Sequence, residues 1–132
     1  MQKYLATSVG NTSSNRTKYS MFIGRWQPWH AGHRWLIDQR LNEGKKVLLC
    51  IRDVERDEKN PWTAQEILEN LKNELKSLIE EERVVVIVIP DIESVNIGRG
   101  VGYDVIEHVP PTEIDSISAT AVREDLKAKG KL

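Results

Sequence analysis

The chain has 132 residues, of which 39% are hydrophobic, and a formal net charge of −1 at pH 7. This length suits one domain with a single core, and the balanced charge differs from the strongly basic character of general nucleic-acid binders. No stretch reaches the roughly 20 apolar residues that a membrane span needs, and the N-terminus has no signal-peptide pattern. We therefore expect a cytoplasmic protein with neither a nucleic-acid nor a membrane partner.

Residues 1–18 are mostly polar, with serine, threonine and asparagine clustered between residues 12 and 17. Such a composition buries little apolar surface, so we expect a flexible N-terminal extension, followed by a single domain over residues 19–132. The only cysteine, Cys50, lies in an apolar run and has no partner for an internal disulfide. We expect it to be a buried, reduced thiol.

Three apolar runs predict strands. Each run is nearly continuous rather than alternating, which is typical of parallel strands covered on both faces. The predicted strands span residues 19–24, 46–51 and 84–89. Two helices with apolar residues at helical spacing connect them, the first over about 29–42 and the second from a Thr63–Glu66 capping box to about residue 82.

The last third of the chain is less regular. Three glycines between residues 98 and 102 predict a loop, residues 103–109 are predicted to form a fourth strand, and two prolines then break the chain. Ser118 or Thr120 is predicted to cap a final helix that ends near Lys129. This order predicts an α/β fold, with a Rossmann-like parallel sheet of four to five strands and flanking helices in a single compact domain. Such sheets bind ligands at the carboxyl ends of their strands.

The stretch from Met21 to Ile37 carries the strongest functional signal. A strand that turns through a glycine into a helix makes an anion site, because the first backbone N–H groups of the helix have no partner. His30 and His33 share one face of the expected helix start and add donors for an oxyanion. We interpret the turn as a nucleotide phosphate site. Metal ligation by the pair, which would need further ligands, and two incidental histidines are the alternatives.

Two motifs resemble those of the nucleotidylyltransferase superfamily, the cytidylyltransferase-like α/β-phosphodiesterase group. Gly24-Arg-Trp-Gln-Pro-Trp-His-Ala-Gly-His33 is similar to its His-x-Gly-His element. Ile117-Ser-Ala-Thr-Ala-Val-Arg123 is similar to its Ile-Ser-x-Thr-x-x-Arg element. The resemblance covers roughly residues 19–127 and implies the nucleotidylyltransferase fold.

The resemblance implies transfer of a nucleoside monophosphate from ATP or CTP to a small phosphorylated acceptor, with release of pyrophosphate. His30, His33 and Arg123 would then be catalytic, because they would stabilise charge on the attacked phosphate and on the departing pyrophosphate. The expected nucleotide-binding residues are Gly24, Arg25, Trp26, Gly32, Ser118 and Thr120. The resemblance also implies Mg²⁺, held mainly by the substrate phosphates, and we expect no protein metal site.

Within the superfamily, three short matches are similar to nicotinamide-mononucleotide adenylyltransferases: Gly24-Arg-Trp-Gln-Pro, Asn60-Pro-Trp-Thr-Ala and Ile89-Pro-Asp91. Arg52, Trp62 and Asp91 are the expected acceptor-binding residues. A CTP-dependent cytidylyltransferase acting on a small polyol phosphate such as glycerol 3-phosphate, and a non-catalytic nucleotide-binding module, are the alternatives. Residues 92–102 are shorter than the corresponding family segment, which shortens the sheet, and an exposed sheet edge favours a homo-oligomer.

Overall fold

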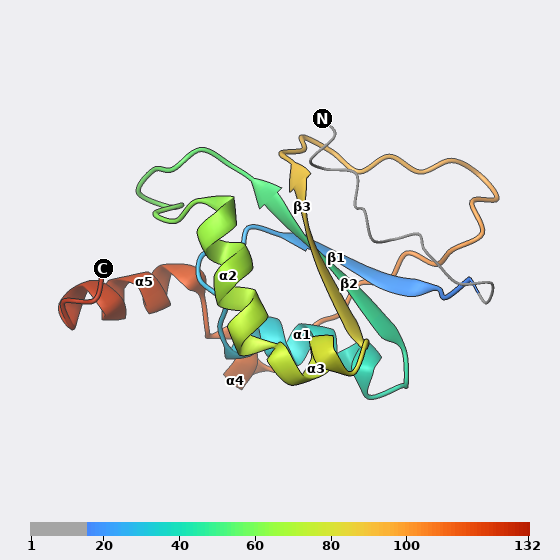
Figure 1. Cartoon of the computed structure of the whole chain (residues 1–132), viewed down its shortest axis with the longest axis horizontal. Coiled ribbons are helices and arrows are strands. Elements are labelled where there is room, and N and C mark those ends of the chain that lie inside the picture. Colours follow the sequence, from blue (N-terminus) through green and yellow to red (C-terminus); the bar gives the residue numbers. More distant parts are fainter. Residues whose placement is uncertain (1–15) are drawn as a thin grey trace.

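A computed structural model of the chain describes residues 16–132 (Figure 1). The first fifteen residues of the expected N-terminal extension lie outside the described residues. The strands are β1 (Tyr19–Gly24), β2 (Lys46–Asp53) and β3 (Val84–Pro90). The helices are α1 (Ala31–Leu41), α2 (Ala64–Glu74), α3 (Lys76–Glu80), α4 (Thr112–Asp115) and α5 (Ala119–Ala128). No helix within residues 16–132 is long and apolar enough to cross a bilayer.

The three strands form one parallel sheet in the order β1-β2-β3. Phe22 of β1 lies opposite Leu49 of β2, which lies opposite Val86 of β3. All three predicted strands are present, with each beginning at the predicted residue and ending within two residues of the predicted end. The α/β class and the parallel sheet are therefore confirmed.

Helices α1 and α2 pack on the same face of this sheet. The strand order makes both crossovers run in one direction, and right-handed crossovers then place both helices on one side. The core cluster accordingly joins one set of alternating strand residues to both helices. Its fully buried members include Val47, Leu49 and Ile51 of β2, Ile37 of α1, and Ile67 and Leu71 of α2.

The capping box predicted for the second helix is present. The Thr63 hydroxyl accepts a hydrogen bond from the Glu66 backbone N–H at 3.1 Å, and the Glu66 carboxylate accepts one from the Thr63 N–H at 2.9 Å. The helix ends earlier than expected, because Leu75 leaves helical geometry between α2 and α3. Leu75 and Leu78 are both buried in the core, as their helical spacing predicts.

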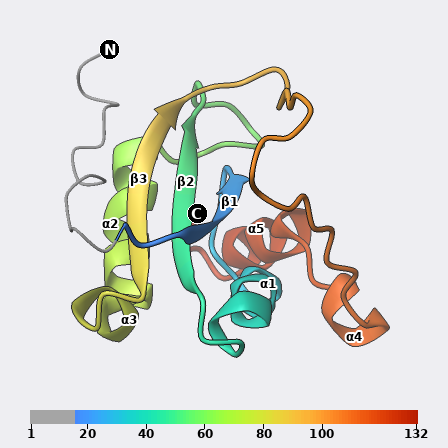
Figure 2. The ribbon, with the colours of Figure 1, turned by 90° about the vertical axis from the view of Figure 1, so that its right-hand side faces the viewer.

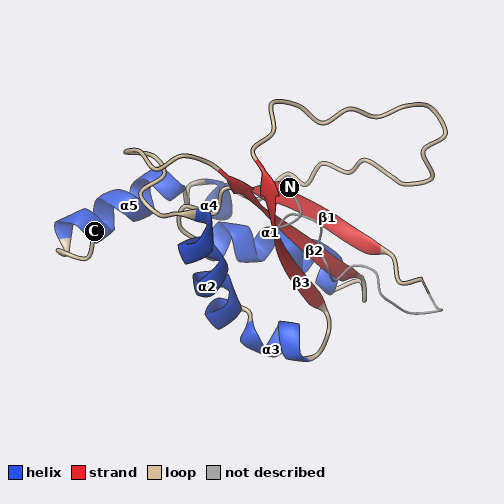
Figure 3. Ribbon diagram, turned by 45° about the horizontal axis from the view of Figure 1, so that its top comes forward, coloured by secondary structure: helices blue, strands red, loops and turns tan. Residues whose placement is uncertain are grey.

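The prediction of a fourth strand over residues 103–109 is wrong. Residues 91–111, here called the arm, contain neither helix nor strand, so the described sheet has three strands rather than four to five. Left-handed glycines at 100 and 102 and the lack of apolar alternation around Val105-Ile106 deprive this segment of the regular pattern with which a strand joins the sheet. Figure 3 shows the arm as a long loop on one side of the strands, with α2 and α3 on the other.

The end of the chain forms two helices rather than one. The prolines at 110 and 111 do break the chain, but the short helix α4 follows them directly, since a fixed proline φ suits the start of a helix. Ser118 then caps α5, as predicted, through a hydrogen bond from the Ala121 N–H at 3.1 Å.

Candidate active site

The start of α1 is built from the two histidines themselves. His30 is the N-cap residue, so the helix begins at Ala31 and not at Trp29 as predicted. The Gly32 backbone N–H donates to His30 Nδ1 at 3.0 Å, and the His30 N–H donates to His33 Nδ1 at 3.2 Å. Two imidazoles thus form a reciprocal capping box. The pair is therefore structural as well as available to a ligand.

These caps decide which ring nitrogen carries the proton. In both rings Nδ1 accepts a hydrogen bond, so each neutral imidazole carries its proton on Nε2. The rings are stacked, with centroids 3.7 Å apart and planes inclined by 20°. Two Nε2–H donors therefore lie side by side at the start of the helix.

The histidines are neutral at neutral pH. Burial lowers the pKa of His30. Burial and, secondarily, repulsion by His30 lower the pKa of His33 to about 3. The rings of Trp26 and Trp29 contribute to this burial, with centroids 4.8 Å and 5.3 Å from that of His33. In the free protein the pair is thus a set of uncharged hydrogen-bond donors.

The two expected nucleotide-binding glycines make room for side chains of the protein. A Cβ at Gly24 would lie 2.8 Å from the Trp26 indole, and one at Gly32 would lie 2.9 Å from His30 Cε1. Both distances are shorter than real Cβ contacts. The glycines are therefore needed for the packing of Trp26 and for the histidine cap, whether or not a ligand approaches them.

Trp26 lies in the core. Only 5% of its surface is exposed, and its indole N–H donates to the Cys50 carbonyl at 2.9 Å. The ring is enclosed by Trp29 and His33 on its outer side. This packing does not favour the predicted contact between Trp26 and a nucleotide.

The second motif meets the first through Arg123. Its side chain is 7% exposed, and Nη1 donates to the Gln27 carbonyl at 2.7 Å, across 96 positions of sequence. Nη2 donates to the Thr120 hydroxyl at 3.3 Å. Within residues 16–132 Arg123 makes no ion pair with a carboxylate. A buried cation with only neutral partners is an electrostatic signal for an anion, because burial of an unpaired charge is costly.

Gln27 is a site residue that the sequence did not single out. It is 3% exposed, and its side-chain amide donates to the Trp62 carbonyl at 2.9 Å while accepting from the Trp62 N–H at 3.2 Å. Its own carbonyl receives Arg123. Gln27 therefore joins the start of α2, the loop after β1 and α5. Its place between Trp26 and Pro28 gives no sign of these three partners.

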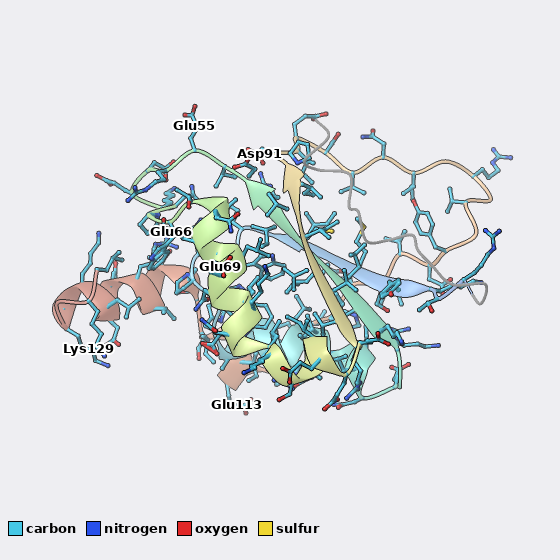
Figure 4. The ribbon with its side chains drawn as sticks, viewed as in Figure 1. Glu55, Glu66, Glu69, Asp91, Glu113 and Lys129 are labelled. Carbon is cyan, nitrogen blue, oxygen red and sulfur yellow. The ribbon has the colours of Figure 1, made fainter. Side chains whose placement is uncertain are left out.

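A polar cavity of about 480 Å³ lies at the carboxyl ends of β2 and β3. Figure 4 shows Glu55 and Asp91 at this end of the sheet. The lining residues are Arg25, Arg52, Val54, Glu55, Asp57, Asn60 and Asp91. Two of the three expected acceptor-binding residues, Arg52 and Asp91, thus face one cavity. The third, Trp62, is absent from the lining and packs against the core.

The two arginines of the cavity are held in place by different partners. Arg52 forms an ion pair with Asp91, with Nη2 and Oδ1 2.7 Å apart. Arg25 Nη1 donates to Asn60 Oδ1 at 3.2 Å. Asn60 is 6% exposed and is itself bonded to Asp57, whose carboxylate accepts from the Asn60 side chain at 2.9 Å. The loop over residues 54–60 is therefore ordered around the base of the cavity.

Comparison with known proteins agrees with the motifs. No family model matches the chain. A curated nicotinamide-nucleotide adenylyltransferase of Caldivirga maquilingensis is 34% identical over 77 residues, which are 56% of this chain and 43% of the relative. One of Methanococcus aeolicus is 31% identical over 114 residues, which are 84% of this chain and 63% of the relative. The chain is similar to nicotinamide-nucleotide adenylyltransferases.

This similarity confirms the resemblance to nucleotidylyltransferases, with the nicotinamide-nucleotide branch among its relatives. A third adenylyltransferase of the same name, from Saccharolobus solfataricus, is 31% identical over 80 residues, or 58% of this chain and 46% of the relative. The chain spans about half the length of the curated relatives that it matches.

Proposed function

We propose that the chain transfers an adenylyl group from ATP to the phosphate of nicotinamide mononucleotide, with release of pyrophosphate. The observation that carries this proposal is the bond between Arg123 and the Gln27 carbonyl. It ties α5 to the loop that leads into α1, and on this basis we assign the two imidazole donors and the buried guanidinium to one polyphosphate. The names of the relatives support the adenylyl group and the nicotinamide nucleotide.

In the proposed reaction, an oxygen of the acceptor phosphate attacks the α-phosphorus of the triphosphate. A bond forms between these two atoms, the bond from the α-phosphorus to its bridging oxygen breaks, and pyrophosphate leaves with that electron pair. The Nε2–H groups of His30 and His33 donate to α-phosphate oxygens, where negative charge develops. The attacking group is already an anion, so positioning and electrostatic stabilisation carry the rate.

The second motif would hold the leaving group. Ser118 and Thr120 lie at the first turn of α5, where unpaired backbone N–H groups favour the β- and γ-phosphates. Arg123 has a permanent charge and further N–H donors for the departing pyrophosphate.

Mg²⁺ would supply additional charge neutralisation between the phosphates. The donor set at the two helix starts consists of N–H and hydroxyl groups, which suits phosphate oxygens and not a resident cation. Within residues 16–132 no group of three or more histidine, cysteine or carboxylate side chains is arranged to hold a metal. The proposal therefore places the ion on the substrate.

The cavity at the ends of β2 and β3 is the proposed acceptor site. Arg25 and Arg52 offer positive charge for the acceptor phosphate, and the carboxylates of Glu55, Asp57 and Asp91 suit ribose hydroxyls and a cationic nicotinamide ring. One observation favours a second candidate, a cytidylyltransferase acting on a small polyol phosphate. Within the described residues no aromatic side chain lines the cavity, so an acceptor that has no ring would forgo no stacking contact there.

The test is pyrophosphate release by the purified chain with Mg²⁺, each of ATP and CTP, and three acceptors. The acceptors are nicotinamide mononucleotide, glycerol 3-phosphate and ribitol phosphate. We expect release with ATP and nicotinamide mononucleotide. Release only with CTP and a polyol phosphate would replace the proposal with the second candidate. Triphosphate binding without turnover would indicate a non-catalytic nucleotide-binding module.

A matched pair of variants shows whether release depends on the site. Arg52→Ala removes one of the two cavity arginines, whereas Arg34→Ala removes an exposed arginine of α1 that is paired with Asp38. We expect the first to raise KM for the acceptor at least tenfold and the second to leave it unchanged. Equal effects of the two variants would show that the cavity is not the acceptor site.

A further inference from the structure

The sheet has one covered and one uncovered face. The strand residues that alternate with the core residues form rows across the sheet: Met21, Leu48 and Val85 in one row, and Ile23, Cys50 and Ile87 in the next. Figure 2 looks toward this face, with α2 behind β3. Purely parallel sheets are normally covered on both faces. Within residues 16–132 this sheet lacks its second layer.

The missing layer follows from the path of the chain after β3. In place of a helical crossover, the chain continues into the arm, residues 91–111, and returns to the sheet at His108. The His108 ring stacks on Phe22 of β1, with centroids 6.2 Å apart and planes inclined by 22°. The arm thus runs from one outer strand of the sheet to the other. Most of it lies on the side away from α2 and α3 (Figure 3), and its His108 end reaches Phe22, whose side chain belongs to the core.

Exposed apolar side chains are concentrated on these two features. Of the ten exposed large hydrophobic residues that the structure describes, nine lie on β1 or on the arm. They are Tyr19, Met21, Val95, Ile97, Val101, Tyr103, Val105, Ile106 and Val109. Val105 and Val109 are 72% and 79% exposed. Large exposed apolar patches are rare on monomeric proteins and mark interaction sites.

We propose that a second copy of this chain covers this face, with the arm of each copy lying on the uncovered sheet face of the other. A two-fold contact requires one chain to supply both halves of a complementary surface, and here the apolar arm and the apolar sheet face supply them. A specific interface takes about 800 Å² and roughly 20–30 residues from each partner. The arm and the exposed strand residues together provide about that number.

The sequence of residues 1–15 contains few apolar side chains. Apart from Met1, their large apolar side chains are Tyr4, Leu5 and Val9, and most of the other residues are polar. Three such side chains do not match an apolar face that spans three strands. The interface proposal concerns a surface away from the histidine pair, and it does not depend on the proposed reaction.

The first test is the mass of the full chain in solution by sedimentation equilibrium, up to about 100 μM. We expect a dimer, and a double variant with Val105→Asp and Val109→Asp should weaken dimerisation at least tenfold, because it places charge in the apolar contact. Leu132→Asp changes an exposed apolar residue outside the patch and should leave the dimer intact. A monomeric wild-type chain, or an arm variant that dimerises as tightly as wild type, would overturn the proposal.

A cysteine cross-link tests the arrangement itself. Met21→Cys and Val105→Cys variants are purified separately, mixed and oxidised; the native Cys50 is buried and contributes little background. We expect a disulfide-linked heterodimer, because the arm of one copy meets the sheet face of the other. Mixing Met21→Cys with Leu132→Cys is the control and should give no cross-link. A dimer in which only the control pair links would contradict the arrangement.

Discussion

The starts of α1 and α5 are both capped by a side chain, but the two caps differ in their chemistry. Each start follows a turn. Arg123 of α5 donates to the carbonyl of Gln27, which lies in the loop that precedes α1. At α1 the caps are two half-buried imidazoles, which are neutral because partial burial lowers the pKa of each. At α5 the cap is the Ser118 hydroxyl, and the charge comes from a guanidinium that does not titrate.

This difference suggests that the two helix starts bind different parts of the triphosphate in the proposed reaction. Neutral N–H donors at α1 bind the α-phosphate without a strong ground-state attraction, so their contribution can grow as charge develops. The fixed cation at α5 suits pyrophosphate, which is highly charged both before and after it leaves. The predictions below separate the two helix starts, from the largest expected effect on activity to the smallest.

The largest effect is expected at His33. We expect His33→Ala to lower kcat by about 10²-fold or more, because it removes a donor to the α-phosphate and also half of the capping box. His33→Asn is the matched variant, since its side-chain oxygen can accept the His30 N–H but its amide does not reach the position of Nε2. We expect His33→Asn to keep the melting temperature and still lose turnover. Full turnover in His33→Asn would limit His33 to a structural role.

Arg123→Lys is expected to raise KM for the triphosphate about tenfold, with a smaller effect on kcat. A single ammonium cannot reproduce the two bonds to Gln27 and Thr120 while also facing a phosphate. Steady-state kinetics at varied triphosphate concentration measures the change. Lys127→Ala, in the exposed last turn of the same helix, is the control. Unchanged kinetic constants in Arg123→Lys would show that the second motif does not bind the triphosphate.

The last prediction concerns stability and not turnover at neutral pH: the lowered pKa of His33 makes the free energy of unfolding depend on pH. The His33 pKa is about 3 in the folded protein, against an ordinary value of 6.5. The unfolded chain therefore binds more protons between these values, and the free energy of unfolding should fall as the pH decreases below 6.5, by up to about 1.4 kcal/mol per pH unit. Above pH 6.5 this contribution is constant.

Urea denaturation at a series of pH values measures this slope. Lowered carboxyl pKa values, such as those of Asp57 and Glu66, also reduce stability in acid, so the informative quantity is the difference from His33→Asn. We expect the variant to lose less stability than wild type between pH 6.5 and 4.5. Parallel curves would show that His33 is not held neutral by the fold.

The elements that the sequence predicts well are those with a local physical cause. The three strands are continuous apolar runs, and the Thr63–Glu66 box is a contact between residues three apart. The predicted loop around Gly98–Gly102 is present, but the predicted strand over residues 103–109 is wrong, because a β-rich composition does not make a strand without a register to join. That the sheet has helices on only one face within residues 16–132 cannot be read from any single segment.

In the candidate site, too, features with a local cause can be predicted from the sequence and features that depend on distant segments cannot. The two motifs could be recognised from residue types and short spacings. The double role of His30 as cap and donor, the burial of Trp26 and the partners of Gln27 depend on contacts between distant segments. The bond from Arg123 to Gln27 spans 96 positions and has no local sequence signal.

The central claim is that the two helix starts form one phosphate site, and a double-mutant cycle on triphosphate affinity tests it most directly. Calorimetry would give Kd for ATP with wild type, His33→Asn, Arg123→Lys and the double variant. One shared site predicts non-additive losses, with a coupling energy of about 0.5–3 kcal/mol. Strictly additive losses, or no loss in either single variant, would contradict the account.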